Sequence, residues 1–397
     1  MGSTKSAKRE LRSISGEPIL RSFMELQRNN FKKAMKVFSS CPQDAFYYAN
    51  NEALINYNMG KKNTAVHMLH KIISSATPEM LYNLAIMNLF TGNFQNAYNI
   101  LFNLIPYFKH NPRLWFRLAE CKLEELKEQK VDDFDLISRK QDIVWGYVGE
   151  GLHRKLVLRG CTNEIKGKDD LIFARRCLLN ALCLIKIGDE IVFYPSNYPT
   201  ENELKRFKIA VYLSLSYVNL SLCDYLMAHN YASEALNLSP TGYQKVLAHL
   251  YAGEALILLD KIREAIRHFS PDVISEDSAK PKSESSGSGG GGGSGNGSAA
   301  TGAVNVTSER QVANTVDWYP HTAKVVLCYN LSVAYTLRGE YNKASETLRS
   351  IGPNLSGPNE AMLPIQVIIL AIYIQLAQGY VDLAKSIIKQ HLPQYRR

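Results

Sequence analysis

The strongest constraint on the fold is a helix–turn–helix pattern over residues 81–120. Apolar residues recur three and four positions apart on both sides of Gly92-Asn93, which is the period of an amphipathic helix. Gly92 suits the turn because glycine tolerates the backbone angles at a helix exit. Pro112 cannot continue a helix. The spacing therefore predicts two packed helices and the start of a third at Arg113.

The same pattern recurs along the chain. Small residues stand where paired helices would cross, and seven alanines mark the second helices: Ala34, Ala65, Ala97, Ala228, Ala265, Ala344 and Ala384. The first three are 31 and 32 residues apart, close to the roughly 34-residue period of the tetratricopeptide repeat (TPR). The predicted fold class is therefore all-α, a TPR superhelix (α-solenoid) in which stacked helix pairs share one core and enclose a concave groove.

Two stretches interrupt the repeats. The fourth repeat begins around Trp115 and is broken by a charged insertion at about residues 122–170, in which residues 143–148 could form a short strand or a buried turn. Residues 275–315 are rich in Gly and Ser and predict a disordered linker, because they offer almost nothing to bury. We therefore expect a flexible N-terminus (1–17), a solenoid (18–274), the linker, and C-terminal TPR helices (316–393).

Composition limits the class of protein. Hydrophobic residues make up 46% of the chain, which is typical of a globular protein. The net charge of +9 permits contact with acidic partners or RNA without requiring it. Seven cysteines form no C-x-x-C pair, which predicts reduced thiols in an intracellular protein. We expect no membrane span and no secretory signal. The first six residues fit an N-myristoylation pattern at Gly2, although chance or an expression scar would give the same letters.

No pattern in the chain points to catalysis or to a cofactor. The carboxylate pairs at 132–133 and 169–170 lie in charged segments, and His67 and His70 have no evident third ligand, so no metal site is expected. His153, Arg154 and Lys155 follow a Gly-x-Gly in the insertion. They could contact a phosphate, form a structural turn or contact a partner, and we favour structure or partner contact over catalysis.

A TPR groove is lined by the first helix of each pair. The groove-facing positions here are Asn50 and Leu54, Tyr82 and Ile86, Leu213 and Tyr217, Leu250 and Glu254, and Tyr329 and Val333. None is basic, which argues against a clamp for a partner's terminal carboxylate and favours an apolar, aromatic seat for a protein. The predicted partner-binding residues are Tyr82, Ile86, Tyr217, Tyr329, Val333, His153, Arg154 and Lys155. The equally open alternative is that some of them are inter-repeat core.

Three sequence blocks carry a family resemblance: NPRLWFRLAEC (111–121), VGxGxHRK (148–155) and LYAxEAL (250–256). With the order of repeats, they resemble the tenth subunit of the CCR–NOT (carbon catabolite repressor–NOT) mRNA deadenylase complex, over most of residues 18–393. The resemblance implies a non-catalytic scaffold in cytoplasm and nucleus that acts in poly(A) shortening, mRNA decay and translational repression. It also implies two protein partners, the eleventh subunit and the N-terminal region of the large NOT scaffold subunit.

The chain departs from that family in two respects. It is short, since family members usually carry further N-terminal repeats, and its linker is unusually rich in Gly. Two other functions stay open on the sequence. One is direct RNA binding through basic surface residues, which salt should weaken steeply. The other is an enzyme seated on the 122–170 insertion.

Overall fold

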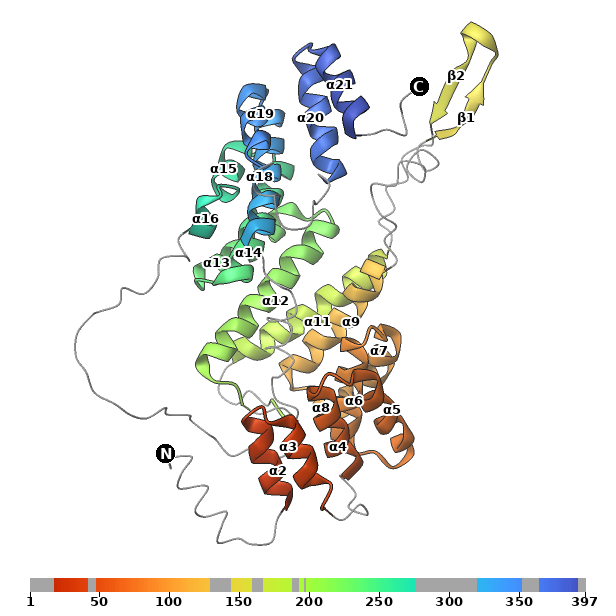
Figure 1. The fold of residues 1–397 in the computed structure, drawn as a ribbon, viewed down its shortest axis with the longest axis vertical. Helices are drawn as coiled ribbons and strands as arrows, with labels where there is room; N and C mark the ends of the chain where they lie inside the picture. The colour runs from red at the N-terminus through yellow and green to blue at the C-terminus, as the bar shows by residue number, and fades with distance from the viewer. Residues whose placement is uncertain are drawn as a thin grey trace, which may run out of the picture. The chain divides into compact units, whose positions relative to one another are not determined.

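The computed structural model describes residues 18–41, 48–128, 144–158, 167–187, 193–195, 198–275, 320–351 and 364–391. Helices dominate these ranges (Figure 1), and the all-α TPR class is confirmed. The N-terminal segment 1–17 with Gly2 lies outside the described residues. So do Asp132, Asp133, Cys161 and all of the predicted linker after Ser275. None of the described helices combines the length and the apolar character that crossing a lipid bilayer requires.

The chain divides into two compact units. Among the described residues, unit 1 comprises those up to Glu125 together with 176–200. Unit 2 comprises those from 126 to 175, from 201 to 275, and from 320 onward. Helices α9 and α11 cross the boundary, so each contributes residues to both units.

Unit 1 is built from successive helix pairs. The pairs are α2 (Pro18–Gln27) with α3 (Phe31–Phe38), α4 (Tyr48–Asn58) with α5 (Lys62–Lys71), and α6 (Pro78–Phe90) with α7 (Phe94–Asn103). A 3-10 turn, η1 (Ile73–Ser75), follows α5, and the short α8 (Ile105–Phe108) precedes α9 (Pro112–Glu128). The second helix of one pair contacts the first helix of the next, as in α3 with α4 and α5 with α6.

Unit 2 repeats this arrangement. Its pairs are α12 (Glu201–Ser221) with α13 (Tyr225–Asn237), α14 (Gly242–Leu258) with α15 (Ile262–His268), α18 (Pro320–Leu337) with α19 (Tyr341–Arg349), and α20 (Ile365–Ala377) with α21 (Val381–His391). The short α16 (Asp272–Ser275) follows α15. The first helices contact one another in order, α12 with α14, α14 with α18 and α18 with α20. They therefore form one continuous wall.

All seven helix pairs in the described ranges turn in the same way. One residue at each turn has a positive φ: Asn29, Gly60, Gly92, Cys223, Asp260, Gly339 and Gly379. The backbone N–H of the following residue donates to the carbonyl five positions earlier, at 2.8–3.0 Å in every pair. This is the hydrogen bond of a Schellman motif, which closes a helix through a left-handed residue. The identical turn gives every pair the same geometry.

Small residues let the paired helices approach closely. The second-helix alanines Ala34, Ala65, Ala97, Ala228, Ala265 and Ala344 are fully buried, and Ala384 is 2% exposed. In three pairs a buried serine hydroxyl on the first helix donates to the carbonyl of that alanine at 2.8–2.9 Å, as Ser216 does to Ala228. In the α14–α15 pair Gly253 takes the serine's place, because a Cβ there would lie 2.5 Å from the Phe269 ring.

The insertion contains a β-hairpin. Strand β1 (Val144–Val148) pairs antiparallel with β2 (Lys155–Leu158), and the turn includes a 3-10 segment, η2 (Gly151–His153). Of the two alternatives for residues 143–148, a short strand or a buried turn, the structure shows the strand, and Tyr147 and Val148 on it are exposed. The insertion is also shorter than predicted, because α9 continues to Glu128 and α11 (Lys168–Ile187) begins at Lys168.

Candidate docking surface

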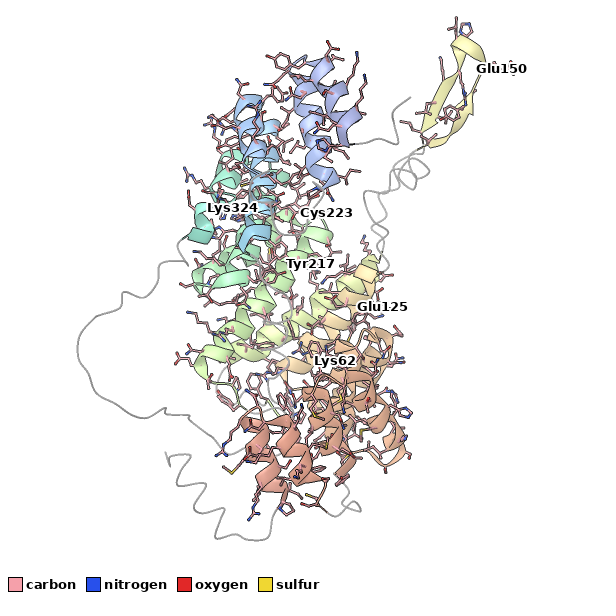
Figure 2. The ribbon with its side chains drawn as sticks, viewed as in Figure 1. Lys62, Glu125, Glu150, Tyr217, Cys223 and Lys324 are labelled. Carbon is pink, nitrogen blue, oxygen red and sulfur yellow. The ribbon has the colours of Figure 1, made fainter. Side chains whose placement is uncertain are left out.

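The first helices of unit 2 carry a row of side chains at equivalent positions. These residues lie ten and six positions before the left-handed residue of each turn, so one helical turn separates the two in each pair. We call them the first-helix row: Leu213, Tyr217, Leu250, Glu254, Tyr329, Val333, Ile369 and Tyr373. Because α12, α14, α18 and α20 contact in order, the row runs across four neighbouring helices. Figure 2 labels Tyr217 on α12.

The row becomes more exposed toward α20. Leu213 is buried, and Tyr217, Leu250, Tyr329 and Val333 are half-buried. On α20, Ile369 and Tyr373 are 39% and 55% exposed. Solvent therefore reaches apolar and aromatic side chains along most of the row.

Helix α20 extends this apolar surface into a stripe. Ile369, Tyr373 and Leu376 follow one another at helical spacing and are 39–55% exposed. The 13 residues of α20 include no charged side chain. A helix that is apolar all round is normally buried, and a contiguous exposed apolar patch usually marks an interaction site. The stripe thus adds Leu376 to the row and is the most exposed apolar part of this surface.

Two tyrosine rings lie close together where the row crosses α12 and α14. The rings of Tyr217 and Tyr251 lie 6.2 Å apart, and the Lys127 ammonium lies 5.9 Å from the centre of the Tyr217 ring. Burial raises the pKa of Tyr251. Glu254, the one acidic residue of the row, is exposed to solvent. No row position is Lys or Arg.

On α6 of unit 1 the equivalent positions are covered, which favours the core alternative for two of the predicted partner-binding residues. Tyr82 and Ile86 are only 6% and 8% exposed, and Tyr82 packs edge-on against Phe108 of α8 at 5.9 Å. The Phe108 ring in turn contacts the Tyr194 ring at 5.8 Å. Tyr82 and Ile86 therefore belong to the core and cannot contact a partner directly in this structure.

The segment that covers them is tied down by hydrogen bonds. The Tyr194 hydroxyl donates to Glu79 in the first turn of α6. Burial would raise the pKa of Glu79, but this bond, with others from its own backbone and Thr77, holds the pKa below its usual value. Asn111 donates to the carbonyls of Phe193 and Tyr194 at 3.0 and 2.9 Å and accepts from the Arg113 backbone N–H at 2.8 Å.

Asn111 opens the NPRLW block, and two further residues of that block, Arg113 and Trp115, also make packing contacts. The Arg113 guanidinium lies 5.4 Å from the centre of the Phe193 ring. The Trp115 indole donates to the Lys109 carbonyl at 2.8 Å. The block therefore joins the start of α9 to residues 193–195, some 80 positions later in the chain.

Comparisons with known proteins agree with the family resemblance seen in the sequence. Residues 206–382 match the family model of the CNOT10 tetratricopeptide repeat domain. The whole chain is 28% identical to CCR4–NOT transcription complex subunit 10-B of Xenopus laevis and 29% identical to subunit 10-A. In a third comparison, 98% of the chain aligns with 77% of subunit 10 of Danio rerio at 28% identity. The chain resembles subunit 10 of the CCR4–NOT complex.

The two Xenopus proteins are longer than this chain, which spans 65% of their length. Among solved structures, the tetratricopeptide repeat sensor protein PH0952 of Pyrococcus horikoshii aligns with 96% of this chain over 48% of its own, with a TM-score of 0.52 and 13% identity. That likeness concerns the fold alone.

The match to the CNOT10 domain starts in α12 and ends in α21. It therefore contains every residue of the first-helix row and the whole α20 stripe. The stripe was missed by the sequence prediction of the groove, although the absence of charge from α20 would have indicated it. Lys127 and Tyr251 were also missed, since neither occupies a repeat position that identifies it.

The remaining predicted residues lie elsewhere. His153, Arg154 and Lys155 are exposed in the hairpin, where the Arg154 guanidinium lies 4.0 Å from the centre of the Tyr147 ring. His67 and His70 are exposed on α5. Among the described residues, no three His, Cys, Asp or Glu side chains are grouped to hold a metal ion.

Proposed function

We propose that this chain is a non-catalytic assembly subunit of a CCR4–NOT deadenylase complex and that the first-helix row is its protein-docking surface. The observation that carries the proposal is the match of residues 206–382 to the CNOT10 domain, because that segment is also the one that exposes the row. Within the complex it would support poly(A) shortening, mRNA decay and translational repression, in both cytoplasm and nucleus.

The chemistry of the row favours a protein partner with an apolar face. Buried aromatic and aliphatic side chains supply most of the binding energy at protein interfaces. The i, i+4, i+7 spacing of the α20 stripe matches the ridge of a helix, which packs against a second helix. The eleventh subunit and the N-terminal region of the large NOT scaffold subunit are the partners that the resemblance implies.

The test is affinity purification of the tagged full chain with quantitative mass spectrometry. We expect the wild type to recover deadenylase-complex subunits. The double variant Tyr373→Glu, Leu376→Glu should recover at least tenfold less of them, because charge on the stripe opposes burial in an interface. Leu226→Glu is the matched control, since Leu226 is 58% exposed on the second helix α13 and outside the row.

The outcomes separate the two parts of the proposal. If the wild type recovers no deadenylase subunit, membership of the complex is refuted. If the wild type and the double variant recover the same amounts, membership stands and the row is not the docking surface. The alternative of direct RNA binding is tested with a 20-nucleotide poly(A) strand, whose binding should fall steeply between low and moderate salt if phosphate contacts carry it.

A further inference from the structure

The hairpin in the insertion has one face made of apolar side chains. In the β1–β2 register, Val144 is opposite Leu158 and Tyr147 is opposite Leu156, with a bulge between Val144 and Gly146. Opposed residues share a face, and so do residues two apart on one strand. Val144, Tyr147, Leu156 and Leu158 therefore form one surface, which we call the apolar hairpin face.

This face is open to solvent. Tyr147, Leu156 and Leu158 are 49%, 50% and 56% exposed, and Val144 is half-buried. In the described part of the chain the sheet has two strands, so each strand keeps one unpaired edge. Two-stranded hairpins are only marginally stable in water without a surface to pack against. The exposed face is therefore one that a bound surface would stabilise.

The turn of the hairpin is shaped and basic. Gly149 has a φ of +88°, and a Cβ there would lie 2.6 Å from the His153 carbonyl oxygen, so no other residue fits this turn without strain. The turn places Leu152 fully in solvent, beside exposed His153, Arg154 and Lys155. Glu150 is the one acidic residue between positions 144 and 158.

We propose that the apolar hairpin face is a second docking element and that it binds a protein surface in which apolar residues are bordered by Asp or Glu. The apolar side chains would be buried, and the carboxylates would pair with Arg154, whose guanidinium lies on this face over the Tyr147 ring. RNA fits less well, because Val144, Leu156 and Leu158 cannot stack on bases. The Arg154 guanidinium also covers one side of the Tyr147 ring.

The hairpin proposal rests on the proposed function only in taking the partner to be a protein. Its test therefore detects binding at the hairpin directly and does not require the CCR4–NOT complex. A photo-crosslinking amino acid replaces Leu156 in the full chain expressed in cells, and mass spectrometry maps the adducts. We expect crosslinks to a protein segment that contains apolar and acidic residues. Arg154→Glu in the same chain should reduce these crosslinks at least tenfold. The same crosslinker at Leu226 is the control for general surface contacts, since Leu226 is as exposed as Leu158.

A second pair of substitutions replaces apolar side chains of the hairpin face by polar ones and introduces no charge. Leu156→Ser with Leu158→Ser, in a chain without the crosslinker, should lower affinity-purified recovery of the protein that the crosslinks identify by at least tenfold, while Leu226→Ser leaves it unchanged. Adducts to RNA, adducts confined to this chain or to a second copy of it, or adducts that persist after the charge reversal would each overturn the proposal. Loss of the deadenylase subunits from the wild-type purification with these crosslinks intact would refute the proposed function and leave the hairpin proposal standing.

Discussion

Gly253 lies in the middle of α14, where replacing glycine by alanine would ordinarily stabilise a helix by about 1 kcal/mol. The structure reverses that expectation. A Cβ at this position would lie 2.5 Å from both Cε1 and Cζ of Phe269, against about 3.5–4.0 Å for an ordinary carbon contact. The Phe269 ring would have to move by roughly 1 Å, and it is only 1% exposed in the core formed with Leu256, Ala265 and Leu327.

Overpacking of this kind costs about 1–3 kcal/mol. After the helix-propensity gain is subtracted, Gly253→Ala should lower the free energy of unfolding by about 1 kcal/mol, within a range of about 0–2. Phe269→Leu removes the two ring carbons that collide with the new Cβ. In that background Gly253→Ala should instead stabilise the protein by up to about 1 kcal/mol, so the effect of one substitution changes sign with the other.

The assay is urea denaturation of the full chain followed by circular dichroism, with hydrogen exchange on the peptides that cover α14 and α15. Hydrogen exchange reports the pair itself, which matters because long repeat arrays do not always unfold in one step. A stabilising Gly253→Ala in the wild-type background, or an equal effect in both backgrounds, would refute the argument from close packing.

Three further predictions follow from burial. Ala97→Leu adds three carbons at a position with no exposed surface and should lower the free energy of unfolding by about 1–3 kcal/mol, measured as a shift in the urea midpoint. Burial raises the pKa of the Cys121 thiol to about 12, so thiolate is only about one part in ten thousand at pH 8. The exposed Cys183 should therefore react with iodoacetamide long before Cys121 in the native protein, and equal rates by mass spectrometry would contradict this. Burial, and then the charge of His229, lowers the pKa of His268, so the unfolded chain takes up this proton first and stability is lost as pH falls below about 6.5. His268→Gln should lose less stability than the wild type between pH 7 and pH 5, and an unchanged pH profile would count against it.

The repeat geometry is largely readable from the sequence, because glycine is a recognisable choice for a left-handed residue. Gly60, Gly92, Gly339 and Gly379 mark four of the seven described turns. Cys223 performs the same role with a φ of 61°, although nothing in its side chain favours that conformation. There the stacking of α12 on α13 fixes the turn, and only the surrounding periodicity could locate it.

Long-range contacts are the part that the sequence could not supply. The NPRLW block stands out as a motif, but its role depends on Phe193 and Tyr194, which lie beyond the insertion. Local periodicity describes one helix at a time and does not indicate which distant segment returns to cover it. The hairpin shows the same limit, since a run of apolar residues predicts a strand equally well whether it is buried or exposed.

Tyr82 and Tyr217 show why the site was harder to predict than the fold. Tyr82 stands ten positions before its turn residue and Tyr217 six before its own, so both are inner positions of a first helix. In unit 1 the chain's own α8 and residues 193–195 cover Tyr82 through Phe108 and Tyr194. In unit 2 the corresponding surface carries the half-buried Tyr217 and the exposed Tyr373. The repeat pattern thus specifies an apolar inner wall in both units, but contacts from outside the repeat decide whether that wall is core or docking surface. A partner bound to unit 2 would then bury the same class of positions that α6 of unit 1 buries against the chain's own residues.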